Sequence, residues 1–103
     1  MLTDVIESNG DNDAIAMKAR FNLGGLEEQQ GHANEAVKYY MLVAVLYKNA
    51  DYSSQALFKA GGLLEGQGKP LDARKAYEEI VQGYPQSPLI EQAKKRIEVL
   101  RGQ

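Results

Sequence analysis

The stretch "ARFNLGGLEEQQGHANEAVKYYMLVAVLY", residues 19–47, returns 37 residues later in this chain as "ALFKAGGLLEGQGKPLDARKAYEEIVQGY", residues 56–84. Twelve of the 29 aligned positions are identical, including a pair of adjacent glycines in each copy. One further step of 37 residues reaches three apolar residues near the end of the chain, Ala93, Ile97 and Leu100. The sequence therefore predicts two repeat units and the first helix of a third.

The apolar residues of each copy recur at steps of three and four, the period of an amphipathic helix. The first half of each copy carries one such stripe: Ala19, Leu23 and Leu26, repeated as Ala56, Ala60 and Leu63. The second half carries another: Ala36, Tyr40, Val43 and Tyr47, repeated as Ala73, Tyr77, Ile80 and Tyr84. The short links between the stripes begin with Gly31 and Gly68, and glycine just past a helix end supplies a left-handed turn. We predict an all-α fold of antiparallel helix hairpins, with helices over residues 13–30, 33–48, 51–67, 70–83 and 87–101.

The helix pattern divides the chain into four parts. Residues 13–50 form the first repeat, 51–86 the second, and 87–103 a C-terminal capping helix. Residues 1–12 form an N-terminal segment, of which residues 1–10 align with the tail of a second helix, residues 38–47. Its apolar residues Leu2, Val5 and Ile6 are expected to cap the first repeat or to remain from a preceding unit. Two helix starts have specific signals. Pro70 suits the first turn of its helix, and Ser87 is the expected N-cap of the last helix, with Pro88 at the first helical position.

The glycine pairs admit two interpretations, a phosphate-binding loop or a close helix–helix contact. A phosphate loop needs a strand before it and a helix start after it. Gly24, Gly25, Gly61 and Gly62 instead follow apolar helical residues, at the same offset in both copies. Each interior glycine costs a helix roughly 1 kcal/mol relative to alanine. We therefore expect these glycines to allow a neighbouring helix to approach closely.

Composition and charge exclude several classes of function. The chain has 103 residues, which favours one domain, and its net charge of −2 gives no general attraction to nucleic acid. It has no cysteine, so thiolate metal sites and cysteine nucleophiles are excluded. The longest nearly apolar run, residues 36–47, is shorter than the roughly 20 residues that span a bilayer. We expect no nucleic-acid partner and no direct membrane insertion.

Residues that could carry catalysis are isolated from one another. His32, the only histidine, lies in a predicted turn without a partner histidine nearby in sequence. The adjacent carboxylates Glu27–Glu28 and Glu78–Glu79 point about 100° apart on a helix and are expected to face solvent. We find no nucleophile elbow, zinc-helix motif or Walker loop. The sequence predicts no enzyme, no cofactor and no metal site.

The spacing of Gly61, Gly68, Ala73, Tyr77 and Pro85 resembles the tetratricopeptide repeat, and the first unit matches it except for a lysine at the proline position. This resemblance covers roughly residues 12–101. It implies a right-handed superhelix of helix pairs, in which the first helix of each pair lines a concave face that binds a peptide or a partner's helix. The chain is thus expected to be a protein-interaction scaffold whose partner is a protein or peptide.

The period of 37 residues departs from the 34 that are usual in the family. Together with the link "YPQSPLIEQA", residues 84–93, it resembles the longer units of bacterial cell-envelope members, such as lipoproteins of the outer-membrane β-barrel assembly machine and the Tol–Pal coordinator. This likeness favours a periplasmic or outer-membrane-associated location over a cytoplasmic one.

Phe21 and Phe58 lie off the stripe that joins the helices, and each is followed one turn later by a glycine. In the family's geometry these positions face the concave side. The predicted partner-binding residues are Lys18, Phe21, Gly25, Gln55, Phe58, Gly62, Gln92 and Lys95. The two rings would form a groove for an apolar side chain of the partner, or would simply pack against the next helix.

The second helix of the first unit carries Met41, Leu42 and Val45 where the second unit has Glu78, Glu79 and Gln82. Soluble monomers usually avoid an exposed patch of this kind. Either the N-terminal segment covers it, or another chain does. The alternative function is therefore a self-assembly module that dimerises through the outer face of the helix over residues 33–48.

Overall fold

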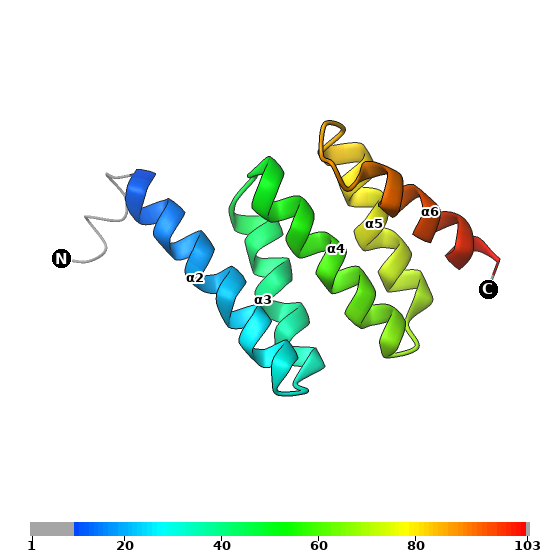
Figure 1. Cartoon of the computed structure of the whole chain (residues 1–103), viewed down its shortest axis with the longest axis horizontal. Helices are drawn as coiled ribbons and strands as arrows, with labels where there is room; N and C mark the ends of the chain where they lie inside the picture. Colours follow the sequence, from blue (N-terminus) through cyan, green and yellow to red (C-terminus); the bar gives the residue numbers. More distant parts are fainter. Residues whose placement is uncertain (1–9, 103) are drawn as a thin grey trace.

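The computed structural model of this chain describes residues 10–102, with side chains from residue 13 onward. Within that range the chain forms only helices and no strand. The helices are α2 Gly10–Gln29, α3 Ala33–Leu46, α4 Ala50–Gly66, α5 Pro70–Gly83 and α6 Ile90–Arg101. Consecutive helices pack against each other, α2 also contacts α4, and α2 and α6 lie at opposite ends of the row (Figure 1). The predicted all-α fold of helix hairpins is confirmed.

The first helix of each unit, α2 or α4, is followed by a turn that contains a glycine with positive φ. Gly31 has φ +82° and Gly68 has φ +73°. The residue after each glycine donates its backbone N–H to a carbonyl five residues earlier. His32 donates to the Glu27 carbonyl at 2.8 Å and Lys69 to that of Leu64 at 2.9 Å. This is the Schellman arrangement, which confirms the predicted role of both glycines.

Two helix starts have clear local causes. The side-chain oxygen of Asn49 accepts hydrogen bonds from the backbone N–H groups of Asp51 (3.0 Å) and Tyr52 (2.9 Å), which caps α4. Pro70 is the first residue of α5, as predicted, because its missing N–H would have no helical partner there. α2 already includes Gly10, which lies before the predicted helix start at residue 13.

The start of the last helix was predicted wrongly. α6 begins at Ile90, three residues after Ser87, and Leu89 is its N-cap. Ser87 is buried, and its hydroxyl donates to the Ser54 hydroxyl (3.0 Å) and accepts from the Leu89 backbone N–H (3.1 Å). Its carbonyl accepts the Ile90 N–H at 3.2 Å. These contacts hold a tight turn before α6 and tie it to α4.

The core consists of two clusters that share one side chain. The first lies around α2, α3 and α4 and contains the buried residues Met17, Ala36, Tyr40, Val43, Ala56 and Ala60. The second lies around α4, α5 and α6 and includes Leu57, Ala73, Tyr77, Ile80, Ala93 and Ile97. Met41 packs against both clusters and is half-buried. The predicted stripes are thus buried wherever a second helix lies against them.

The stripe on α2 is the exception. Ala19, Leu23 and Leu26 correspond to Ala56, Ala60 and Leu63 of α4, but all three are exposed, Leu26 by 53%. In α4 the equivalent face packs against α3, whereas within the described residues α2 contacts only α3 and α4, on its other sides. The predicted cover from Leu2, Val5 and Ile6 lies outside the described residues.

Candidate functional site

One contact joins the first and second helix of each unit: a tyrosine ring against a glycine. A Cβ on Gly24 would stand 2.7 Å from Cε1 of Tyr40, which is closer than side-chain carbons approach, so only glycine leaves room for the ring. Tyr40 is completely buried at that point. Tyr77 sits against Gly61 in the same way in the second unit. Close approach of the neighbouring helix therefore explains Gly24 and Gly61, as predicted.

The second glycine of each pair has a different environment. A Cβ on Gly25 would meet only the Tyr40 hydroxyl, at an ordinary 3.7 Å, and one on Gly62 would meet no atom within 4 Å. Close packing was therefore the wrong explanation for these two. Because they carry no side chain, Gly25 and Gly62 leave space on the helix surface one turn after each phenylalanine. All four glycines lie inside helices, which is incompatible with a phosphate-binding loop.

The tyrosine hydroxyls reach across to a glutamate on the first helix. Tyr40 donates to Oε1 of Glu28 at 2.8 Å, and Tyr77 donates to Oε2 of Glu65 at 2.7 Å. Burial, and then the hydrogen bond to the glutamate, raises the pKa of both hydroxyls, so both tyrosines stay protonated donors. Glu28 was expected simply to face solvent; it is exposed, but the tyrosine fixes its carboxylate.

The two phenylalanines pack on these tyrosines. The ring centroids of Phe21 and Tyr40 are 5.5 Å apart, and those of Phe58 and Tyr77 are 5.4 Å apart. Phe21 also meets the Tyr52 ring of α4 edge-on at 5.3 Å. Both phenylalanines are half-buried. Each ring therefore packs internally against neighbouring helices, as one of the two alternatives predicted, and is only half-buried. The other alternative, a groove for an apolar side chain of a partner, stays a prediction.

A groove of about 700 Å³ opens between α2 and α4. Its lining on α2 includes the predicted residues Phe21 and Gly25, together with Asn22, Leu26, Glu28 and Gln29. Tyr40 of α3 and Lys59 of α4 complete it. The groove thus combines two aromatic rings and an exposed leucine with one carboxylate and one ammonium group.

The remaining predicted binding residues do not line this groove. Phe58 and Gly62 lie one unit further along, on α4. The others are exposed on the first helices α2, α4 and α6: Lys18, Gln55, Gln92 and Lys95. Sequence reasoning missed six contributors that the structure places in the groove: Asn22, Leu26, Glu28, Gln29, Tyr40 and Lys59. One signal was present, because Glu28 and Glu65 are identical at the offset of 37 residues.

In the second unit an arginine occupies the equivalent space. Arg96 of α6 donates its Nε to Oε2 of Glu65 at 3.0 Å, and one of its terminal nitrogens donates to the other carboxylate oxygen. The hydrogen bond from Arg96 lowers the pKa of Glu65, with burial acting in the opposite direction. The residue 37 positions before Arg96 is Lys59, which makes no ion pair with Glu28 among the residues that the structure describes.

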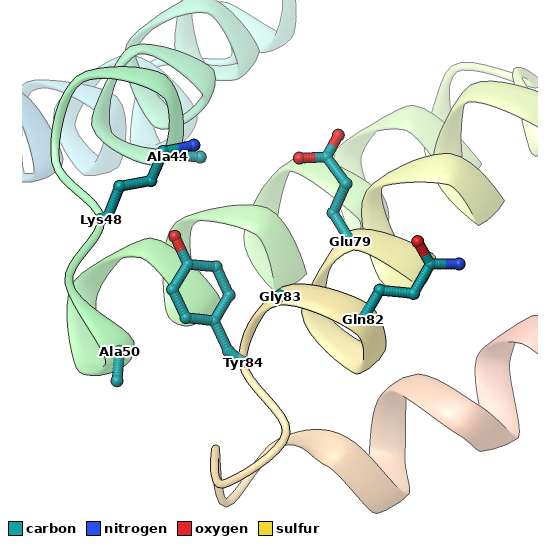
Figure 2. A pocket seen from close by; sticks show the side chains of 7 residues that line it. All are labelled: Ala44, Lys48, Ala50, Glu79, Gln82, Gly83 and Tyr84. Carbon is teal, nitrogen blue, oxygen red and sulfur yellow. The ribbon is translucent and has the colours of Figure 1, made fainter.

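The outer face of α3 is only partly free. Met41 packs into the core clusters, so it is not a surface residue of the kind expected for an oligomer face. Leu42 and Val45 are 40% and 63% exposed, and Leu46 beside them is 53% exposed. A second cavity, of about 480 Å³, lies between the ends of α3 and α5 and contains no predicted site residue. Figure 2 shows Lys48 after α3, and Glu79 and Gln82 on α5, around the ring of Tyr84.

Other potential sites are sparse in the described part of the chain. His32 lies in the turn after α2, as predicted, and its Nδ1 is 2.6 Å from Oε1 of Glu27. Across residues 13–102 no three histidine, aspartate or glutamate side chains converge as a metal site would require. None of the helices α2 to α6 combines the length and apolar character that crossing a bilayer demands.

One comparison with known proteins agrees with the repeat pattern in the second unit. A family model described as "Tetratricopeptide repeat" matches residues 55–87, which contain most of α4, the whole of α5 and the turn that follows. The match supports the assignment of this unit to that family. Neither the curated proteins nor the solved structures gave a match. Tetratricopeptide repeats typically act as non-catalytic scaffolds for protein interactions.

Proposed function

We propose that this chain binds a segment of a partner protein in the groove between α2 and α4. The observation that carries the proposal is the composition of that groove. The half-buried ring of Phe21 stands beside the low surface at Gly25, with the exposed side chain of Leu26 on the same helix. An apolar side chain of a partner could bury its surface there, at roughly 25 cal/mol per Å² of apolar area. Glu28 and Lys59 would select among partners by charge.

The binding surface is proposed to continue along the first helix of each unit. This extension rests on the resemblance to tetratricopeptide repeats, in which those helices line a concave face. It would include Lys18, Gln55, Phe58, Gly62, Gln92 and Lys95, of which all but Phe58 are exposed. A partner segment lying across α2, α4 and α6 would then reach both phenylalanines.

The test is a selection of binders from a peptide library on the full chain. Gly25→Leu should fill the groove without disturbing the fold, because its Cβ meets only one atom at contact distance. Gly83→Leu is the matched control, since Gly83 lies in the other cavity and has no atom within 4 Å of a Cβ. Peptides that bind Gly83→Leu but not Gly25→Leu would support the groove. Peptides that bind both variants equally would contradict it.

The extension to the second unit has its own test. If the partner segment spans both units, Phe21→Ala and Phe58→Ala should each lower the affinity of the chain for the selected peptides, and the double variant should lower it further. If only Phe21→Ala weakens binding, the site is confined to the α2–α4 groove. The same double variant in affinity capture from native extract would show which natural partners depend on this face.

Self-association through α3 is the second candidate, because Leu42, Val45 and Leu46 are exposed side by side on that helix. Light scattering of the wild type and of Leu42→Glu separates the candidates. A wild-type dimer that Leu42→Glu converts to monomer supports the self-association surface. A monomeric wild type, or a dimer that survives the substitution, excludes it.

The finer likeness to cell-envelope members rests on the period of 37 residues and on the link after α5. We propose on that basis a periplasmic or outer-membrane-associated location. Fractionation of cells that express the native gene would test it, and recovery in the cytoplasmic fraction would contradict it.

A further inference from the structure

The two units differ in how the glutamate beside the buried tyrosine is satisfied. In the second unit Glu65 accepts the Tyr77 hydroxyl and the forked guanidinium of Arg96, so both carboxylate oxygens have charged donors. In the first unit Glu28 accepts the Tyr40 hydroxyl on Oε1. No hydrogen bond to Oε2 of Glu28 is formed by the residues that the structure describes. Equivalent carboxylates of the two units therefore differ within the described part of the chain: Glu65 is paired with a guanidinium group, and Glu28 is not.

The surroundings of the open carboxylate suit a guanidinium group. A carboxylate offers about four acceptor positions, and the planar fork of arginine fills two of them with parallel hydrogen bonds. Guanidinium also stacks on aromatic faces, and the half-buried ring of Phe21 provides one in the groove. The exposed side chain of Leu26 offers apolar surface for the methylene stem of an arginine.

We propose that the partner segment inserts an arginine into the α2–α4 groove, with its guanidinium on Glu28 as the guanidinium of Arg96 lies on Glu65. This inference rests on the proposed function and names the chemistry of its central contact. Lys59 takes the place of Arg96 in the sequence repeat and lines the groove. A lysine is a flexible point charge that cannot make the fork. Lys59 therefore leaves the site open to an arginine from outside, although its charge repels that arginine.

Three small probes test the site directly by amide chemical shifts of the full chain: N-acetyl-arginine amide, N-acetyl-lysine amide and N-acetyl-citrulline amide. Arginine should shift residues around Phe21, Gly25 and Glu28, lysine should bind several-fold more weakly, and citrulline, which is uncharged, should bind weakest. Glu28→Gln keeps an acceptor for Tyr40 and should weaken arginine binding by roughly tenfold or more. Glu27→Gln is the matched control and should bind as the wild type does, because Glu27 pairs with His32 instead.

Lys59→Met distinguishes a partner that binds through an arginine on Glu28 from one that binds through a carboxylate on Lys59. Removal of the ammonium group should tighten arginine binding, whereas a partner held by its carboxylate on Lys59 would bind less tightly. The inference is overturned if arginine gives no localised shifts, if it binds no better than citrulline, or if Glu28→Gln leaves its affinity unchanged.

The library selection separates this inference from the proposed function. Peptides that need the groove, lack arginine and tolerate Glu28→Gln would overturn the arginine site while leaving the groove as the binding surface. A library that yields no peptide sensitive to Gly25→Leu would overturn the proposed function, and the arginine site with it. Groove-dependent peptides rich in arginine, and weakened by Glu28→Gln, support both.

Discussion

The ring of Tyr77 fills the space in which a side chain at residue 61 would lie. A Cβ on Gly61 would stand 2.7 Å from both Cε1 and Cζ of that ring. The ring has no freedom to withdraw, because it is 2% exposed, stacks edge-on against Phe58 and donates its hydroxyl to Glu65. This contact holds α4 and α5 together and repeats between α2 and α3.

Gly61→Ala is therefore expected to destabilise the chain. Overpacking a filled core costs typically about 1–3 kcal/mol, and the gain in helix propensity returns roughly 1 kcal/mol of it. Gly62→Ala is the control on the next residue, and it should stabilise the chain by about 0.5–1 kcal/mol because its Cβ meets nothing. Urea unfolding measures both. Equal stability of the two variants would contradict the contact with Tyr77.

The turn glycines give a second prediction, for the conformation of the chain rather than for its packing. Gly68→Ala places a Cβ at φ +73°, which costs about 1–2 kcal/mol in the left-handed region. Gly66→Ala, two residues earlier in α4, has open space and should raise stability slightly. For a chain of this size we expect the melting temperature of Gly68→Ala to fall by roughly 4–8 °C per kcal/mol. A wild-type melting temperature for Gly68→Ala would rule out the Schellman turn.

The ion pair of Glu65 and Arg96 predicts a pH dependence. The pair lowers the pKa of Glu65 from its ordinary value of 4.5, so folding favours the ionised carboxylate. Its contribution to stability is fully present above pH 4.5 and is lost as the pH falls through the lowered pKa. Glu65→Gln should lose less free energy of unfolding than the wild type over that acid range.

Arg96→Gln tests the cause of this dependence, because it keeps the carboxylate and removes the group that lowers its pKa. Its acid stability curve should follow that of Glu65→Gln more closely than that of the wild type. Unfolding at a series of pH values by circular dichroism provides the curves. Parallel curves for the wild type and Glu65→Gln would show that the pair does not lower the pKa.

The hydroxyl pair of Ser54 and Ser87 gives a fourth prediction. Ser87→Ala removes the hydrogen bond to Ser54 and the acceptor of the Leu89 N–H, at a cost of about 1–2 kcal/mol. A double-mutant cycle with Ser54→Ala should show that the two losses are not additive, because one hydrogen bond is counted in both. Additive losses would mean that the two hydroxyls do not interact.

Much of the fold was predictable because two copies of one pattern carry the same information twice. The stripes, the turn glycines and Pro70 are local signals, and each predicted its element correctly. The start of α6 depends on a contact that is not local in the sequence. Ser87 looks like an N-cap in the sequence, but its hydroxyl bonds to Ser54, 33 residues away. Helical periodicity gives no indication of such a contact.

The site was predictable only in part, for a similar reason. Phe21 and Gly25 were identified from their position on one helix. The fixed orientation of Glu28 depends on a tyrosine of the next helix, and the groove depends on Lys59 of the helix after that. Met41 shows the opposite error, because its predicted place on the outer side of α3 did not reveal that it packs against both core clusters.

The spacing of the tyrosine–glycine contact also has a consequence for protein engineering. Since the apolar stripes of a unit recur every 37 residues, a duplicate of residues 49–85 inserted after Pro85 would present the apolar side of a new α4 to the existing α5. The chain could then be lengthened in whole units once the new interface is adjusted where α4 and α6 differ, as at Lys59 and Arg96. The number of candidate grooves between successive first helices would then become a variable that the experimenter chooses.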